Sequence, residues 1–185
     1  MDIPFSLEGR TALIAGASSG FGARFAKLFA AAGANVVLGA RRMDRTDALA
    51  KEIIDEGGKA LAVPLDVTDE ASIIAAYDAA EAKFGTVDTI VANAGVAATG
   101  RSTEVPADRL QMLLDTNFKG VYLVAREGAK RLIASGSREK ENGRIVIIGS
   151  ITSRLTGEGD SAYAASKAGV THLGRNLARE WVRMG

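Results

Sequence analysis

The chain has 185 residues and carries 23 Lys and Arg against 22 Asp and Glu, so its formal net charge of +1 favours neither nucleic acid nor an anionic lipid surface as a partner. It contains no cysteine and a single histidine, His172, which excludes zinc fingers, Cys/His metal clusters and thiol nucleophiles. No apolar run approaches the roughly 18 residues of a membrane span, and the chain opens Met1-Asp2 without a basic segment. We therefore expect no metal, no membrane, no signal peptide and a cytoplasmic location.

Short apolar runs alternate with helix-like patterns along the chain. Strands are expected at 11–15, 36–38, 61–65, 89–92 and 145–148, each followed by a helix, and the two longest helices at about 108–134 and 162–183. Thr68 is placed to cap the third helix, with Asp69 and Glu70 in its first turn. The polar segment 135–143 is expected to be an exposed loop.

Apolar strands that alternate with amphipathic helices predict a parallel sheet with helices on both faces. A chain of this length forms about one domain. We therefore expect one doubly wound α/β domain over residues 1–185.

A glycine-rich loop follows the first expected strand and opens the first helix. Gly16, Gly20 and Gly22 allow a tight turn and a close approach of the backbone to a diphosphate, which unpaired amides and the helix dipole attract. The same loop spells the GxSxG of a serine hydrolase through Ser18. That alternative fails on context, because Ser18 follows the first strand and His172 lies inside a helix. A structural glycine turn is the remaining alternative.

Two arginines stand where a dinucleotide fold usually places an acid for the ribose hydroxyls. Arg41 and Arg42 follow the second strand, about 20 residues past the glycine loop. A guanidinium binds a 2′-phosphate that a carboxylate would repel, so this position favours NADP(H) over NAD(H). The alternative is a pair of solvated surface arginines.

Tyr163 and Lys167 are four residues apart on one helical face, so the ammonium can stabilise a phenolate for acid–base work. Ser150, at the end of the fifth strand, could polarise a substrate carbonyl. On the long helix Asn117 is the one polar member of an otherwise apolar stripe. A carboxamide on a buried face must find hydrogen-bond partners, so Asn117 either caps a kink or belongs to a polar site. The stripe comprises Leu110, Leu114, Asn117, Val121 and Val124.

These residues together resemble the classical short-chain dehydrogenase/reductase family over nearly the whole chain. The matching segments are the glycine loop, Asp66-Val67 on the adenine side, Asn93-Ala94-Gly95, and the set Asn117, Ser150, Tyr163 and Lys167. The resemblance implies a Rossmann-like dinucleotide-binding fold. It further implies that Tyr163 transfers the proton, Ser150 orients the carbonyl or alcohol, Lys167 favours the phenolate and holds the nicotinamide ribose, and Asn117 supports a proton-relay water. The expected cofactor-binding residues are Gly16, Ser18, Ser19, Gly20, Phe21, Gly22, Arg41, Arg42, Asp66, Val67, Asn93, Ala94, Gly95, Tyr163 and Lys167.

The resemblance implies an NADP(H)-dependent oxidoreductase that interconverts a ketone and a secondary alcohol. A noncatalytic dinucleotide-binding module is the alternative. The apolar residues near the sheet edge, among them Val96, Ala97 and Ile151, suggest an uncharged small-molecule substrate. The family commonly pairs through its two long helices, so we expect a homodimer or homotetramer.

The sequence departs from the family pattern in three places. Ala15 replaces the usual threonine and Ala92 the first asparagine of the Asn-Asn-Ala-Gly segment, and we expect the two losses to compensate each other. The chain also stops at Gly185, where relatives continue with further strands and a substrate-covering segment. We therefore expect a truncated chain whose fifth strand is an unpaired sheet edge, with reduced turnover.

Overall fold

The computed structural model of the chain describes residues 5–184. Residues 1–4, on which the expectation of no signal peptide partly rests, lie outside the described residues, as does Gly185.

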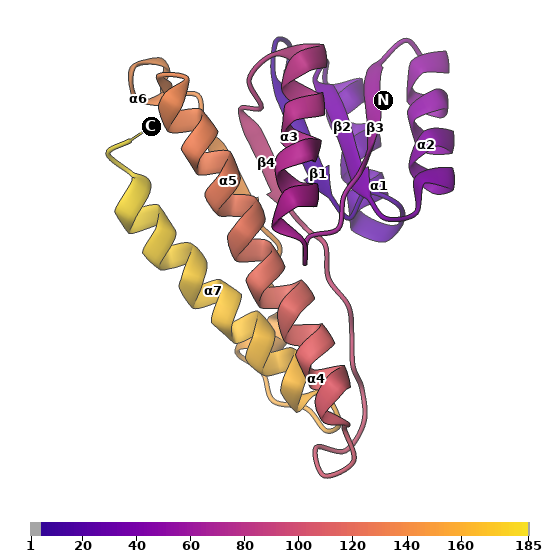
Figure 1. Cartoon of the computed structure of the whole chain (residues 1–185), viewed down its shortest axis with the longest axis vertical. Coiled ribbons are helices and arrows are strands. Elements are labelled where there is room, and N and C mark those ends of the chain that lie inside the picture. The colour runs from indigo at the N-terminus through magenta and orange to yellow at the C-terminus, as the bar shows by residue number, and fades with distance from the viewer. Residues whose placement is uncertain (1–4, 185) are drawn as a thin grey trace.

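Within the described residues the fold is built around a five-stranded parallel sheet with the order β3-β2-β1-β4-β5 (Figure 1). Every strand pair is parallel and in continuous register, so Ala15 of β1 lies opposite Gly39 of β2 on one side and Ala92 of β4 on the other. The strands are β1 (Thr11–Ala15), β2 (Asn35–Ala40), β3 (Lys59–Pro64), β4 (Thr89–Ala92) and β5 (Arg144–Ile147). The expected doubly wound parallel sheet is thus confirmed.

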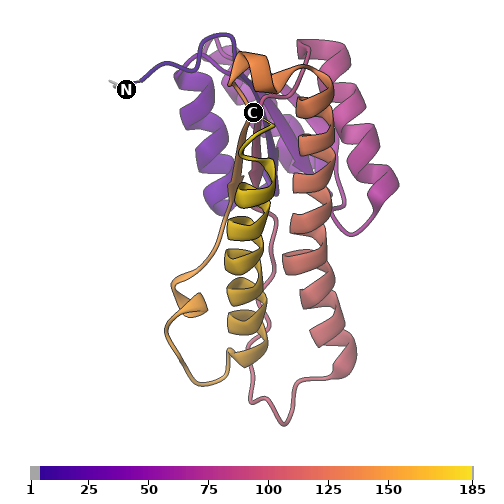
Figure 2. The ribbon, with the colours of Figure 1, turned by 90° about the vertical axis from the view of Figure 1, so that its left-hand side faces the viewer.

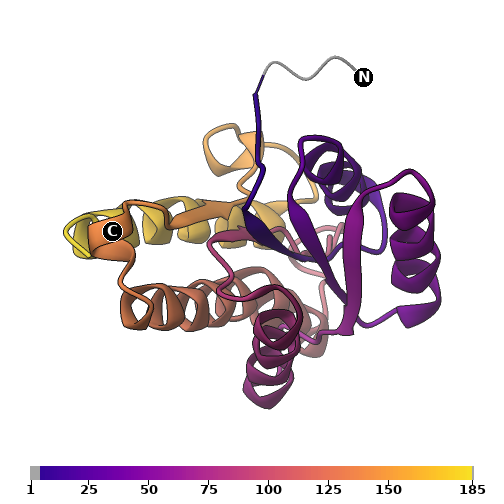
Figure 3. The same cartoon turned by 90° about the horizontal axis from the view of Figure 1, so that it is seen from above.

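Helices cover both faces of the sheet (Figure 3). Residues alternate between the faces along each strand, so Ile14 packs with α1 and α2 while Leu13 packs with α3, α5 and α7. The helices are α1 (Gly20–Ala31), α2 (Met43–Asp55), α3 (Glu70–Phe84), α4 (Ala107–Leu114), α5 (Val121–Ala134), α6 (Ser137–Lys140) and α7 (Ser161–Trp181). Two dry cores result, one on each face of the sheet.

The two long helical segments lie side by side and extend beyond the sheet (Figures 1 and 2). One is α7, and the other runs from α4 through a π-helical turn, η1 (Asp115–Gly120), into α5. The π turn changes which residues of the expected apolar stripe are buried. Val121 and Val124 are buried, but Leu110 and Leu114 are exposed and Leu113 is buried instead. A π turn inserts one residue into the helical repeat, so the buried position before it moves from 114 to 113.

Two local expectations were wrong. Asp69, and not Thr68, caps α3, because its Oδ1 accepts from the N–H of Ala71 at 3.0 Å, while Thr68 bonds to Asp66 instead. The segment 135–143 is not a plain exposed loop, because it forms the short α6 and buries Ser137, whose Oγ donates to the carbonyl of Met184 at 2.9 Å. In both places a polar side chain bonds to a backbone group, Asp69 to the N–H of Ala71 and Ser137 to the carbonyl of Met184.

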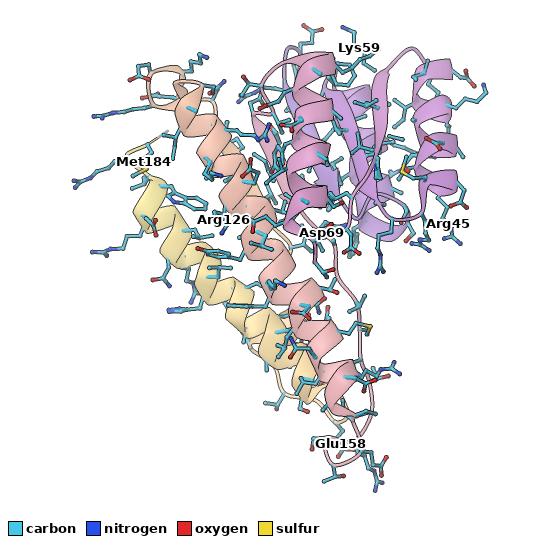
Figure 4. The ribbon with its side chains drawn as sticks, in the orientation of Figure 1. Arg45, Lys59, Asp69, Arg126, Glu158 and Met184 are labelled. Carbon is cyan, nitrogen blue, oxygen red and sulfur yellow. The ribbon has the colours of Figure 1, made fainter. Side chains whose placement is uncertain are left out.

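A half-buried ion-pair network joins α3 to α5. Arg131 lies over the ring of the buried Tyr77 and bonds to Asp78, Glu81 and Glu127 at 2.7–2.8 Å. Along the same two helices Arg126 pairs with Glu70, next to the capping residue Asp69 (Figure 4). These contacts hold α5, which follows the π turn, against α3. None of the helices in residues 5–184 is both long and apolar enough to cross a membrane.

Candidate active site

A cavity of about 690 Å³ lies at the carboxyl ends of the strands, where open parallel sheets bind ligands. It gathers most of the residues that the sequence singled out. Those that line it are Gly16, Ser18, Ser19, Phe21, Arg41, Arg42, Asp66, Val67, Asn93, Ala94, Gly95, Ser150, Tyr163 and Lys167. The cavity wall does not include Gly20, Gly22 or Asn117. Loop segments distant in the sequence therefore meet in one elongated site.

The glycine loop is shaped by close backbone contacts. Gly16 has a φ of +81°, and a Cβ there would lie 2.8 Å from the Cα of Ala94. A Cβ on Gly22 would lie 2.2 Å from the carbonyl oxygen of Gly16. The amide of Asn93 donates to the carbonyl oxygens of Ala15 and Gly16 at 3.2 Å each. Asn93 thus braces the loop from the end of the neighbouring strand, and α1 begins beside the cavity, which Ser19 and Phe21 line.

The two arginines after β2 are differently held. The guanidinium of Arg42 donates to Ser18 Oγ at 2.8 Å and to Ser19 Oγ at 3.0 Å, which links the end of β2 to the glycine loop. Arg41 also lines the cavity and lies close enough to Asp66 to act on its charge. The N–H of Thr68 bonds to the Asp66 carboxylate at 2.9 Å and lowers its pKa below the usual range, and Arg41 adds to this effect. Asp66 is therefore a carboxylate at neutral pH.

At the other end of the cavity Tyr163 and Lys167 lie one turn apart on α7. The Nζ of Lys167 is 5.9 Å from the centre of the Tyr163 ring and donates to the carbonyl oxygen of Ile148 at 2.8 Å. Lys167 is 4% exposed, and this burial lowers its pKa below the ordinary value for lysine. Tyr163 is half-buried and faces the cavity. The pair thus combines an accessible phenol with a fixed cation behind it.

Ser150 lies in the same part of the cavity, beyond the end of β5. The strand ends at Ile147 and not at Ser150 as expected, and Ser150 instead caps a short 3₁₀ turn, η2 (Ile151–Ser153). Its Oγ accepts from the N–H of Thr152 at 3.2 Å and lies 2.9 Å from Thr152 Oγ1. These contacts orient the hydroxyl of Ser150 at the edge of the cavity.

Asn117 is completely buried and bonds to the loop after β4. Its Oδ1 accepts from the N–H of Val96 at 2.8 Å, and its Nδ2 donates to the carbonyl of Val96 at 2.8 Å and to Ser166 Oγ at 3.3 Å. The side chain is satisfied by these partners, so it acts on the cavity through the loop that carries Val96 and Gly95.

Two contributors to the site escaped the sequence interpretation. They are the carbonyl of Ile148 and the hydroxyl of Ser166, which fix Lys167 and Asn117 respectively. A backbone carbonyl carries no sequence signal. Ser166 had a weak one, because it lies next to Lys167 and three residues past Tyr163, on the turn that faces Asn117.

The sequence model of the family described as "short chain dehydrogenase" matches residues 10–185. Oxidoreductase UcpA of Escherichia coli (strain K12) is 37% identical over 183 residues, which cover 97% of this chain and 66% of that protein. The chain therefore spans about two thirds of the length of the curated relatives it matches.

Solved structures agree closely with this fold. The crystal structure of a short-chain type dehydrogenase/reductase from Mycobacterium marinum has a TM-score of 0.92 and 34% identity, covering 97% of this chain and 72% of that one. The structure of a gluconate 5-dehydrogenase from Burkholderia cenocepacia J2315, in complex with NADP and tartrate, has a TM-score of 0.90 and 35% identity, covering 98% of this chain and 69% of that one.

Proposed function

The chain belongs to the short-chain dehydrogenase family, and on that premise we propose that it binds NADP(H) and catalyses hydride transfer between a secondary alcohol and a ketone. The observation that carries the proposal is that one cavity joins the glycine loop to Ser150, Tyr163 and Lys167. When bound, the cofactor supplies or accepts the hydride. The chain's own residues bind it, orient the substrate and move the proton.

The residues present fit a dinucleotide with a 2′-phosphate. Gly16 and Gly22 keep the loop free of side chains where a diphosphate would approach, and the start of α1 supplies donors. Arg42, held by the hydroxyls of Ser18 and Ser19, and Arg41 beside Asp66 would hold the adenosine end. Lys167 and the segment Asn93–Gly95 would hold the nicotinamide end.

We propose that Tyr163 donates its phenolic proton to the carbonyl oxygen on reduction and recovers it on oxidation. Lys167 lies behind the ring and stabilises the phenolate that each turnover produces. Ser150 donates a hydrogen bond to the same oxygen. Asn117 positions the loop at Val96 and so shapes the wall of the cavity.

Titration of the chain with NADPH and, separately, NADH tests the cofactor proposal through reduced-nicotinamide fluorescence. NADPH should bind more tightly, and Arg42→Ala and Arg41→Ala should each weaken NADPH at least tenfold while changing NADH less than twofold. Arg45→Ala is the matched control, because Arg45 lies near the start of α2 and does not line the cavity (Figure 4). Equal affinity for the two cofactors would overturn the assignment to NADP(H).

Turnover tests the catalytic part separately. Tyr163→Phe should abolish ketone reduction and leave NADPH affinity within a few fold, because the ring remains and only the proton is lost. If the chain binds NADPH and turns over no ketone or alcohol, it is a dinucleotide-binding module instead.

We further propose that the chain forms a homodimer or homotetramer through its long helices. Leu114, Phe118 and Tyr122 repeat every four residues and are each at least 37% exposed, forming an apolar ridge on the α4–η1–α5 segment. Phe118→Glu should shift the mass measured by light scattering to that of the monomer. A monomeric wild-type chain would contradict the proposal.

A further inference from the structure

The charged residues that line the cavity are unevenly placed. Arg41, Arg42 and Asp66 follow β2 and β3, whereas Ser150 and Tyr163 lie beyond β5 and on α7. The sheet order places β2 three strand intervals from β5, which corresponds to roughly 14 Å. The arginines are therefore too remote to pair with an acidic group on a substrate held at Tyr163.

Lys167 is the remaining charged residue of the cavity lining in the described part of the chain, and it is engaged elsewhere. Its Nζ donates to the carbonyl oxygen of Ile148, and the whole residue is 4% exposed. A Cβ on Gly95 would lie 3.7 Å from that nitrogen, so the backbone of the loop after β4 lies next to the ammonium. The proposed function also assigns this ammonium to the nicotinamide end of the cofactor, so a substrate carboxylate would compete with the cofactor for it.

The rest of this end of the cavity is uncharged and mostly apolar. It is lined by Val96, Ala97, Ile148 and Ile151, by the backbone of Gly149, and by Thr116, whose hydroxyl donates to the carbonyl of Met112. Ile151 is 72% exposed although it is a large aliphatic residue on a short turn next to Ser150. Together with Val96 and Ala97 it gives this end of the cavity an apolar surface that suits an apolar ligand.

From this arrangement we infer that the substrate is an uncharged ketone or secondary alcohol whose carbon skeleton is apolar, and that Ile151 is the residue that selects it. The inference rests on the proposed function and narrows it to a substrate class. It separates this chain from an enzyme for a sugar acid, whose carboxylate would need a cation at this end of the cavity.

One nearby cation, Arg154, supports the competing possibility that the substrate is acidic. Arg154 borders a second hollow, of about 660 Å³, that shares Gly149, Ser150 and Ile151 with the first but excludes Tyr163 and Lys167. If Arg154 reached across Ile151 it could recruit an acidic substrate. This outcome is distinguishable by experiment.

The test compares two ketones that differ by one charge, cyclohexanone and 4-oxocyclohexanecarboxylate, with NADPH as reductant. The 185-residue chain should show at least a tenfold higher kcat/KM for cyclohexanone. Ile151→Arg should reduce that ratio at least tenfold by supplying the missing cation. Leu155→Arg, at a 58% exposed position that does not line the cavity, is the matched control and should leave the ratio unchanged, as should Arg154→Ala.

The outcomes separate this inference from the proposed function. A preference for the carboxylate, above all one that Arg154→Ala removes, overturns the inference and leaves the proposed function intact. Binding of each ketone to the NADPH complex is measured in parallel by quenching of the nicotinamide fluorescence, so slow turnover does not hide a preference. If NADPH binds but neither ketone binds or reacts, the inference is overturned. If NADPH itself does not bind, the proposed function fails with it.

Discussion

Asn117 bonds to both peptide groups of Val96, accepting from its N–H and donating to its carbonyl at 2.8 Å each. A buried carboxamide thereby replaces the strand partner that Val96 lacks once β4 has ended at Ala92. The contact ties the π turn η1 to the loop that forms one wall of the cavity.

The first prediction concerns this contact. Asn117→Leu removes every hydrogen bond of the side chain and leaves the part-buried N–H and carbonyl of Val96 without this partner, at about 1–3 kcal/mol each. Urea unfolding should show a loss of about 2–5 kcal/mol. Asn176→Leu is the control, because Asn176 is exposed on α7 and bonds to a helix carbonyl, and it should cost much less. Equal losses would show that the bonds to Val96 add nothing.

The glycine loop supplies a matched pair of substitutions. Gly22→Ala places a Cβ 2.2 Å from the Gly16 carbonyl, so the loop must open and NADPH affinity should fall at least a hundredfold. Gly20→Ala meets no atom within 4 Å and costs only about 1 kcal/mol for its φ of +57°. Fluorescence titration and thermal unfolding of both variants distinguish the effects. Similar NADPH affinities for the two variants would contradict the steric account.

Ala15 and Ala92 prove to be register partners on β1 and β4, 1% and 2% exposed. The two departures from the family pattern are thus adjacent in space, as mutual compensation requires. The double variant Ala15→Thr, Ala92→Asn should leave NADPH affinity little changed, whereas Ala92→Asn alone puts an unpaired carboxamide into the core and should destabilise the fold. A gain in affinity above tenfold for the pair would refute the compensation.

Stability should fall in acid through Glu127. Burial raises the pKa of this carboxyl, but the hydrogen bonds from Arg131 and Lys130 outweigh burial and hold it below the usual range. Because the folded-state pKa is the lower one, its contribution is complete above about pH 4.5 and is lost as the pH falls through the folded value. Glu127→Gln should therefore be less stable than wild type at pH 7, with the difference shrinking towards pH 3.

Urea unfolding at a series of pH values measures this effect. Glu158→Gln serves as the control, since Glu158 is exposed at the tip of the molecule remote from the sheet (Figure 4). Parallel curves for wild type and Glu127→Gln would show that Glu127 does not titrate with folding.

The sequence predicted the centre of the sheet well because β1, β2 and β4 are buried on both faces and read as continuous apolar runs, such as 11–15 and 89–92. It also predicted the meeting of Tyr163 and Lys167, since a spacing of four residues fixes a shared helix face. The cavity confirms that these segments come together, although the role of each residue stays a prediction.

Other features depend on contacts that no spacing encodes. Two adjacent arginines cannot be told apart in the sequence, yet it is Arg42 that the hydroxyls of Ser18 and Ser19 hold. Asn93 lines the cavity as the sequence predicted, but the bonds of its amide to the carbonyls of Ala15 and Gly16 were not foreseen. Polar side chains that bond to backbone across strands become visible only in the folded chain.

The π turn gives the long helical segment two phases. Before it the buried position falls at Leu113, and after it the buried row runs through Val121 and Val124. Leu113 and Val121 are eight positions apart, one more than two regular turns, so the π turn absorbs one extra residue while both side chains stay buried. Deleting one residue between 115 and 120 would restore a regular α-helix with Leu113 and Val121 still on one face, but the wide turn that presents Asn117 to Val96 would be lost. The extra residue therefore serves the wall of the cavity and not the packing of the helix.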